Sequence, residues 1–181
     1  MMNFAQTLEI GKTGESLVAQ YFLRLGYSVL PVYEKAGAEH KGPVLFSAAS
    51  GPLIAPDMLV FNNKETLWIE VKHKSAFTWH RVTGEWVTGI DLHHYQQYLL
   101  VQKNRPEWQV WLLFLHENGL AKDTPAGKVP PFGLFGNHIL YLSDHEHHRH
   151  ANHGTGGMVY WSLDALRRSK SFVLPTPPDF F

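Results

Sequence analysis

The sequence contains no cysteine among its 181 residues. Disulfide bonds and metal sites built from thiolates are therefore excluded. A chain without cysteine fits a cytoplasmic protein, and the cytoplasm is the location that we expect. The first residues, Met-Met-Asn-Phe-Ala-Gln, lack a basic region followed by an apolar one, so no secretory signal is visible.

Long hydrophobic runs are also missing. The longest strongly apolar stretch, residues 110–115, is far shorter than the roughly 20 residues that a membrane-spanning helix needs. We therefore expect no membrane association. Hydrophobic residues make up 44% of the chain, which is enough for a packed core, and the length fits a single domain covering residues 1–181.

Neither sign of charge is in excess, because 16 Lys and Arg balance 16 Asp and Glu. Proteins that bind nucleic acids often carry a basic excess, so binding of this kind would have to use a local basic patch. The 12 histidines are unusual. Below about pH 6.5, the ordinary pKa of imidazole, they would make the chain basic.

Hydrophobic periodicity and turn residues predict the order of helices and strands. The expected elements are a helix at 13–25 ended by Gly26, strands at 27–33, 57–61 and 66–72, a hairpin or flap within 73–90, a helix at 91–103 with Asp91 as N-cap, a strand at 109–116, strands at 138–142 and 158–161, and a short helix at 162–168. Loops are expected at 34–55 and 118–136, and irregular structure in the tail from residue 175. This order predicts an α/β sandwich around a small mixed sheet.

The strand at 66–72 ends in two opposite charges. Because side chains alternate along a strand, Trp68, Glu70 and Lys72 share one face. The other face is wholly apolar and suits packing against a helix. The structural alternative is a simple surface ion pair between Glu70 and Lys72.

A two-residue turn at Asn63-Lys64 would place Asp57 directly opposite Glu70 on the neighbouring strand. Opposed residues point to the same face with Cβ atoms roughly 5 Å apart. Two carboxylates at that distance repel each other unless a cation lies between them. Their oxygen atoms suit Mg²⁺ or Mn²⁺, and Lys72 on the same face can polarise an attacking water. The pattern therefore indicates phosphodiester hydrolysis.

Pro56-Asp57 followed after twelve residues by Glu70-Val71-Lys72 resembles the signature of the PD-(D/E)XK nuclease superfamily. The segment Gly11-Lys-Thr-Gly-Glu15, which opens a helix, is similar to that of Holliday junction resolvase-like members. The resemblance covers residues 11–116, with residues 117–181 as additions. It implies a restriction-endonuclease-like α/β/α sandwich with an αβββαβ core.

The same resemblance implies roles for individual residues. Asp57 and Glu70 would bind Mg²⁺ or Mn²⁺ together with the backbone carbonyl of Val71, Lys72 would be the catalytic lysine, and Glu15 would be an auxiliary acid. The expected activity is that of a DNA endonuclease, with RNA as an open alternative. A homodimer is also expected, since cutting two strands needs two sites related by a two-fold axis.

Other residues are candidates for contact with nucleic acid. His73 and Lys74 follow Lys72 in a local basic stretch. On the second helix, one stripe contains Leu92, Tyr95 and Leu99, and another contains His94, Tyr98 and Val101, with Gln97 beside it. Either both stripes pack in the core, or the second faces the substrate.

The His-rich segment 145–153 invites comparison with zinc sites, but its spacing matches no familiar zinc motif, and its glycines suggest a solvated loop. Two functions other than a nuclease stay open. One is a non-catalytic nucleic-acid- or protein-binding module on the same fold. The other is a metal-dependent hydrolase centred on the His-rich loop.

Overall fold

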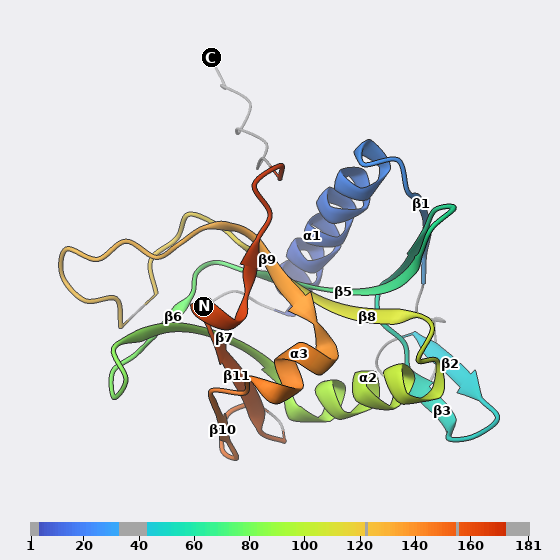
Figure 1. Cartoon of the computed structure of the whole chain (residues 1–181). Coiled ribbons are helices and arrows are strands. Elements are labelled where there is room, and N and C mark those ends of the chain that lie inside the picture. Colours follow the sequence, from blue (N-terminus) through green and yellow to red (C-terminus); the bar gives the residue numbers. More distant parts are fainter. Residues whose placement is uncertain (1–3, 33–42, 122, 155, 173–181) are drawn as a thin grey trace.

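Helices and strands fill most of the part of the chain that the computed structural model describes, which comprises residues 4–32, 43–121, 123–154 and 156–172 (Figure 1). The helices are α1 (Phe4–Arg24), α2 (Leu92–Asn104) and α3 (Ile139–Asp144), with a 3-10 turn at Leu163–Ala165. The strands are β1 (Ser28–Pro31), β2 (Val44–Ser47), β3 (Gly51–Ile54), β4 (Met58–Phe61), β5 (Thr66–Lys74), β6 (Thr78–His80), β7 (Glu85–Asp91), β8 (Gln109–His116), β9 (Gly133–His138), β10 (His148–His150), β11 (Met158–Ser162) and β12 (Arg167–Arg168). Among the described helices, none combines the length and apolar character needed to cross a membrane.

A mixed sheet of six strands, in the order β1-β4-β5-β8-β9-β12, forms the centre of the molecule. Strands β1, β4 and β5 are antiparallel neighbours, and β5 and β8 are parallel. Figure 1 shows α1 on one face of this sheet and α2 with α3 on the other. The order α1, β1, β4, β5, α2, β8 confirms the predicted αβββαβ core and the α/β sandwich.

The alternation along β5 divides the core between the two faces of the sheet. Leu67, Ile69 and Val71 pack with Val18 and Phe22 of α1. Trp68 points the other way, into a second cluster that includes residues of α2 and β8. The predicted apolar face of β5 is therefore confirmed, and it is the face that α1 covers.

The β4–β5 hairpin has the predicted register. Met58 pairs with Ile69 and Phe61 pairs with Thr66. The side chain of Asn62 closes the turn, since its Oδ1 accepts hydrogen bonds from the backbone amides of Lys64 and Glu65. This two-residue turn sets the pairing that carries Asp57 and Glu70 toward each other.

The predicted loop over residues 34–55 is wrong for its second half. Strands β2 and β3 form a hairpin there, with Val44 opposite Ile54. Leu53 is buried in the core, which anchors the hairpin against α2. The short apolar run at residues 44–46 is typical of a strand, but the glycines and prolines around it favoured a loop. Residues 33–42 lie outside the described part of the chain.

Two further predictions near the C-terminus are wrong. The expected strand at 138–142 is the helix α3, and the glycine-rich stretch expected to be a loop contains the start of the buried strand β9. A Cβ atom at Gly136 would lie 2.4 Å from the carbonyl oxygen of Leu112. Glycine is therefore needed for close pairing with β8, and it is not a sign of a loop here. The expected helix at 162–168 is a single 3-10 turn followed by β12.

A second, four-stranded sheet has the order β10-β11-β7-β6. Strands β6 and β7 form the hairpin expected within residues 73–90, and β11 lies near the predicted strand at 158–161. The His-rich segment is more ordered than expected, because residues 148–150 form β10 and pair with β11. This sheet lies at the end of β5 and leads directly into α2 (Figure 1).

Candidate active site

The carboxylates of Asp57 and Glu70 come from neighbouring strands. Asp57 immediately precedes β4, where its carbonyl oxygen accepts a hydrogen bond from the amide of Val32. Its side-chain Oδ2 accepts a second hydrogen bond, of 2.7 Å, from the amide of Val71. Met58 pairs with Ile69 in this antiparallel hairpin. One residue earlier in the first strand and one later in the second, Asp57 therefore lies opposite Glu70.

Glu70 is almost fully buried, with 1% of its surface exposed. Its Oε1 lies 2.5 Å from Nζ of Lys72. Its Oε2 is also buried, and apart from the nearby hydroxyl of Tyr98, which interacts with this carboxylate, no described residue gives it a hydrogen bond. A buried carboxylate oxygen without a partner is rare and indicates a missing ligand or a functional role. The burial also argues against a simple surface ion pair.

The charges of this group shift one another's protonation. Burial, followed by the negative charge of Glu70, raises the pKa of Asp57 well above its ordinary value. Burial alone would lower the pKa of Lys72, but the carboxylates of Glu70 and Asp57 outweigh it and raise that pKa. The acidic pair is thus only partly neutralised by the lysine, and a cation would relieve the remaining repulsion.

Glu15 approaches the pair from α1. Its negative charge also raises the pKa of Asp57, which places it in the electrostatic surroundings of the site. The close approach depends on Gly14, because a Cβ atom there would lie 2.7 Å from Cβ of His73 in β5. The glycine lets α1 lie close against the strand, and the next residue is then held near the carboxylates.

Gly14→Ala is therefore expected to destabilise the protein by about 1–3 kcal/mol, because the new methyl group overlaps a Cβ atom that cannot rotate away. Helix propensity alone predicts the opposite, a gain of up to about 1 kcal/mol. Urea unfolding distinguishes the two. Gly156→Ala is the matched control, since nothing lies within 4 Å of a Cβ atom there. A stabilised Gly14→Ala variant would mean that α1 does not press on β5.

The other predicted contact residues divide into two groups. His94 and Tyr98 lie near Glu70, and Lys74 lies beside Lys72. Burial and the neighbouring Lys72 lower the pKa of Lys74 to about 8. Burial first, and then the charge of Glu70, raises the pKa of Tyr98 well above its usual range.

His94 is half-buried, and burial together with Lys72 lowers its pKa. Tyr98 and Val101 are fully buried, as is Tyr95 from the first stripe. The helix α2 therefore packs into the core along both stripes, while His94 and Tyr98 also approach the site.

The structure does not bring His73 and Gln97 to the acidic pair. His73 lies on the α1 face of β5, its side chain is 5% exposed, and its Nε2 lies 3.0 Å from Oε1 of Glu117. The predicted contact ignored the alternation that sets residue 73 opposite to residue 72. Gln97 instead accepts a hydrogen bond from the amide of Ile54 in β3.

One acidic neighbour of the site was missed by the sequence reasoning. Asp91 occupies the predicted N-cap position of α2, but its side chain makes no capping hydrogen bond. Its negative charge instead raises the pKa values of Lys72 and Lys74. An acid at the junction of a strand and a helix was a visible signal, but capping was the simpler interpretation.

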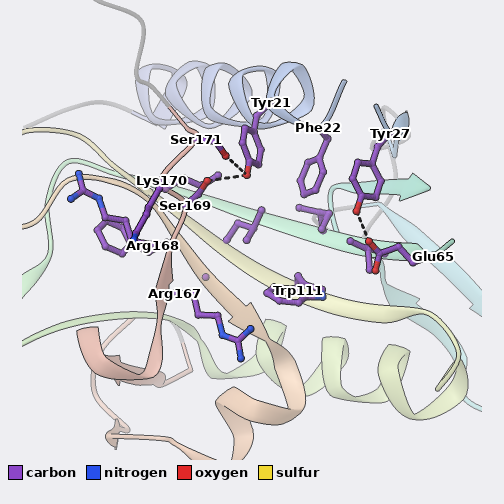
Figure 2. Close-up of a pocket in the computed structure, with 16 residues that line it drawn as sticks. Tyr21, Phe22, Tyr27, Glu65, Trp111, Arg167, Arg168, Ser169, Lys170 and Ser171 are labelled. Atoms are coloured by element: carbon purple, nitrogen blue, oxygen red, sulfur yellow. Dashed lines mark hydrogen bonds between the residues drawn. The ribbon is translucent and has the colours of Figure 1, made fainter. Parts of the chain in front are cut away.

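A separate cavity of about 440 Å³ lies on the α1 face of the sheet. Figure 2 shows its lining, in which the hydroxyl of Tyr21 contacts Ser169 and Ser171, and Tyr27 bonds to Glu65. Because Glu70 and Lys72 point to the opposite face of the sheet, this cavity is not part of the carboxylate site.

Among the side chains that the structure describes, no group of three or more His, Asp or Glu is gathered so that it could hold a metal ion by itself. The acidic site therefore provides two adjacent carboxylates, Asp57 and Glu70, with Glu15 further out on α1. Mg²⁺ commonly binds to one or two carboxylates and completes its shell with water and substrate oxygen atoms. The unpartnered Oε2 of Glu70 fits such an ion.

No protein-family model matches the chain, and no curated protein sequence matches it. Among solved structures, the chain is similar to Hjc, a Holliday junction resolvase from the archaeal hyperthermophile Archaeoglobus fulgidus. The identity is 11% and the TM-score is 0.48, with 86% of this chain and 85% of that chain covered. A likeness at this level says nothing about chemistry, and the fold class rests on the strand order and register given above.

Proposed function

We propose that the protein is a divalent-metal-dependent nuclease that hydrolyses phosphodiester bonds in DNA as an endonuclease. The observation that carries the proposal is the buried, unpartnered Oε2 of Glu70 beside the carboxylate of Asp57, with Lys72 against the same glutamate. A buried Glu70 and a half-buried Asp57 held side by side with one lysine are costly to keep together without a ligand. A cation bound to substrate phosphate would offset that cost.

Asp57 and Glu70 would hold the ion, with the carbonyl of Val71 and the more distant Glu15 as further donors. Mg²⁺ or Mn²⁺ in this place would supply Lewis-acid stabilisation of the phosphoryl oxygen and a more acidic water. These residues suit the ion because hard cations prefer oxygen ligands.

The remaining residues act on substrate and water. Lys72, held by Glu70, would orient the attacking water and stabilise negative charge that builds up on the phosphate. Lys74, beside Lys72, and His94, near Glu70, would contact flanking phosphates. Tyr98, buried beside Glu70, would keep solvent away from the carboxylates.

The test is cleavage of labelled duplex, four-way-junction and single-stranded DNA, and of RNA, with Mg²⁺, Mn²⁺ or EDTA. Cleavage should need the metal, and Lys72→Ala should reduce its rate at least about a hundredfold. Lys103→Ala, a change at the far end of α2, is the matched control and should cut normally.

Cleavage that persists in Lys72→Ala would place the active site elsewhere. Lack of cleavage of every substrate, together with lack of Mn²⁺ binding, would favour a non-catalytic binding module instead. The molar mass of the protein in solution, measured with and without junction DNA, tests whether it forms the expected homodimer.

A further inference from the structure

Five histidines gather on one face of the second sheet. His80 belongs to β6, His148 and His150 to β10, and His147 and His153 flank β10. We call these five residues the imidazole face. They account for a large share of the 12 histidines in the chain, and the proposed active site uses none of them.

The rings of the imidazole face touch one another in a continuous network. His80 and His148 are stacked with ring centroids 4.5 Å apart, and His147 lies edge-on to both. His150 and His153 form a second stack at 3.6 Å. Tyr160 of β11 joins the two groups, because its ring stacks on His148 and its hydroxyl bonds to Nδ1 of His153.

This face continues toward the acidic site along β7 and β11. Tyr160 pairs with Gly89, and a Cβ atom at that glycine would lie 2.7 Å from the tyrosine ring, so the ring lies across the strand. Asp91 lies two residues after Gly89 on the same face of β7. Its negative charge raises the pKa values of Lys72 and Lys74. A polymer that lies along β7 from the imidazole face would therefore run past Asp91 toward the two lysines.

Few fixed charges accompany the histidines. Glu85 of β7 accepts from Nε2 of His147, and Thr83 in the preceding turn contacts both His80 and His147. Arg149 of β10 is paired with Glu146.

Arg81, in the turn after β6, is paired with Asp123, so these two charges largely cancel. Glu85 and Asp91 leave negative charge on this face, so the face becomes positive only when several of its imidazoles carry a proton.

We propose that the imidazole face is a proton-dependent binding surface for the phosphate backbone of the DNA that the proposed active site cuts. The inference rests on the proposed function for its choice of polymer. Protonated imidazoles donate hydrogen bonds and carry positive charge, which phosphate oxygens accept. A row of such groups that ends at two lysines fits an extended polyanion better than a small molecule.

The electrostatics of His148 support this assignment. Burial, and then the repulsion of His80, His147, His150 and His153, lowers the pKa of His148 to about 4. In the absence of DNA, a proton bound to one imidazole thus makes protonation of the neighbouring imidazoles less favourable. Phosphates placed along the face would remove that repulsion, so binding takes up protons and, by linkage, acid strengthens binding.

The experiment measures binding of a fluorescent duplex in EDTA, where no cleavage occurs, at about pH 6 and about pH 8 and at constant ionic strength. We expect wild-type affinity to rise about tenfold at the lower pH, since uptake of one proton can change affinity by up to tenfold per pH unit. The salt dependence should also become steeper there, because more phosphates are neutralised.

Two variants test whether the imidazole face causes the effect. Replacing His80, His148 and His150 by Gln should reduce the pH effect to less than about twofold. His150→Gln with His153→Gln changes only exposed side chains and should give a partial loss. His145→Gln is the matched control, because that ring stacks on Tyr141 outside the face.

Affinity that does not change with pH, or a pH effect that survives the triple replacement, would overturn the inference. Equal pH-dependent binding of polyglutamate would overturn it in favour of an acidic protein partner. The outcome is separable from that of the proposed function. Metal-dependent cleavage without pH-dependent binding rejects the imidazole face alone, and His-dependent binding without cleavage rejects the nuclease alone.

Discussion

Asp57→Asn is expected to reduce DNA cleavage by about a thousandfold and yet to raise the melting temperature of the metal-free protein. The loss of cleavage follows from the loss of an anionic oxygen that would hold the metal ion. The gain in stability follows because the charge that repels Glu70 disappears. An asparagine oxygen can still accept the hydrogen bond from the amide of Val71.

The measurement is a thermal unfolding series in EDTA and in Mg²⁺ or Mn²⁺, run beside the cleavage assay. In wild type, saturating metal should stabilise the fold by about 2.7 kcal/mol at a hundred times the dissociation constant. That shift should vanish in Asp57→Asn, whose melting temperature in EDTA should already be higher, by about 2–4 °C for each kcal/mol gained.

The control is Asp144→Asn, which removes an exposed carboxylate at the end of α3. It should cut normally and keep the metal-dependent shift. An Asp57→Asn variant that melts lower than wild type in EDTA would show that the repulsion is already relieved by another group. A variant that keeps both the shift and the cleavage would remove Asp57 from the metal site.

The β4–β5 hairpin shows how much of the site was accessible from sequence. The length of the turn and strict alternation were sufficient to pair Asp57 with Glu70 and to align Lys72 beside them. These rules are local, so they need no knowledge of the rest of the fold. The same alternation, applied one residue further, would have placed His73 under α1.

Long-range contacts explain what sequence patterns did not reveal. Gly136 permits β9 to pair closely with β8, and only the position of Leu112 shows why a glycine is needed. In the same way, Asp91 has the sequence context of a helix cap, but the lysines that it faces come from β5. Neither relation is encoded in the neighbouring residues.

The His-rich segment also needed the fold to be interpreted. Its spacing matches no familiar zinc motif, and within the described residues no three of its side chains gather around one point as metal ligands would. His80 in β6 and His148 in β10 come from the two edge strands of the second sheet, and their rings stack across its face. The sequence thus gave the His-rich segment, and only the fold shows that His80 joins it.

A second large effect is expected for acid stability, and it arises at His116, the last residue of β8. This side chain is fully buried, its ring is stacked 3.8 Å from that of Phe77, and the one polar group that favours its charged form is the backbone of Ala76. Burial first, and then the charge of Lys74, lowers the pKa of His116 to about 3. The folded protein therefore keeps this imidazole neutral.

The direction in which pH changes the free energy of unfolding follows from the protonation of His116 in the folded and in the unfolded chain. Above about pH 6.5 the imidazole is neutral in the folded and in the unfolded chain, so it adds no pH dependence. Between about pH 6.5 and about 3, the unfolded chain binds a proton that the folded chain refuses. The free energy of unfolding should therefore fall by about 1.4 kcal/mol for each pH unit within that window from this group alone.

His116→Phe should remove this contribution, since a phenyl ring can occupy the stack against Phe77 without titrating. Urea unfolding in EDTA at about pH 7.5, 6 and 5 gives the test, and the quantity compared is the slope with pH, which does not depend on how well the new ring fits. His94, His138 and His148 also have lowered pKa values and should leave a residual loss in both proteins. His145→Gln, on the surface, should behave as wild type. Equal slopes for wild type and His116→Phe would mean that His116 takes up its proton in the folded state, through a local opening near the end of β8.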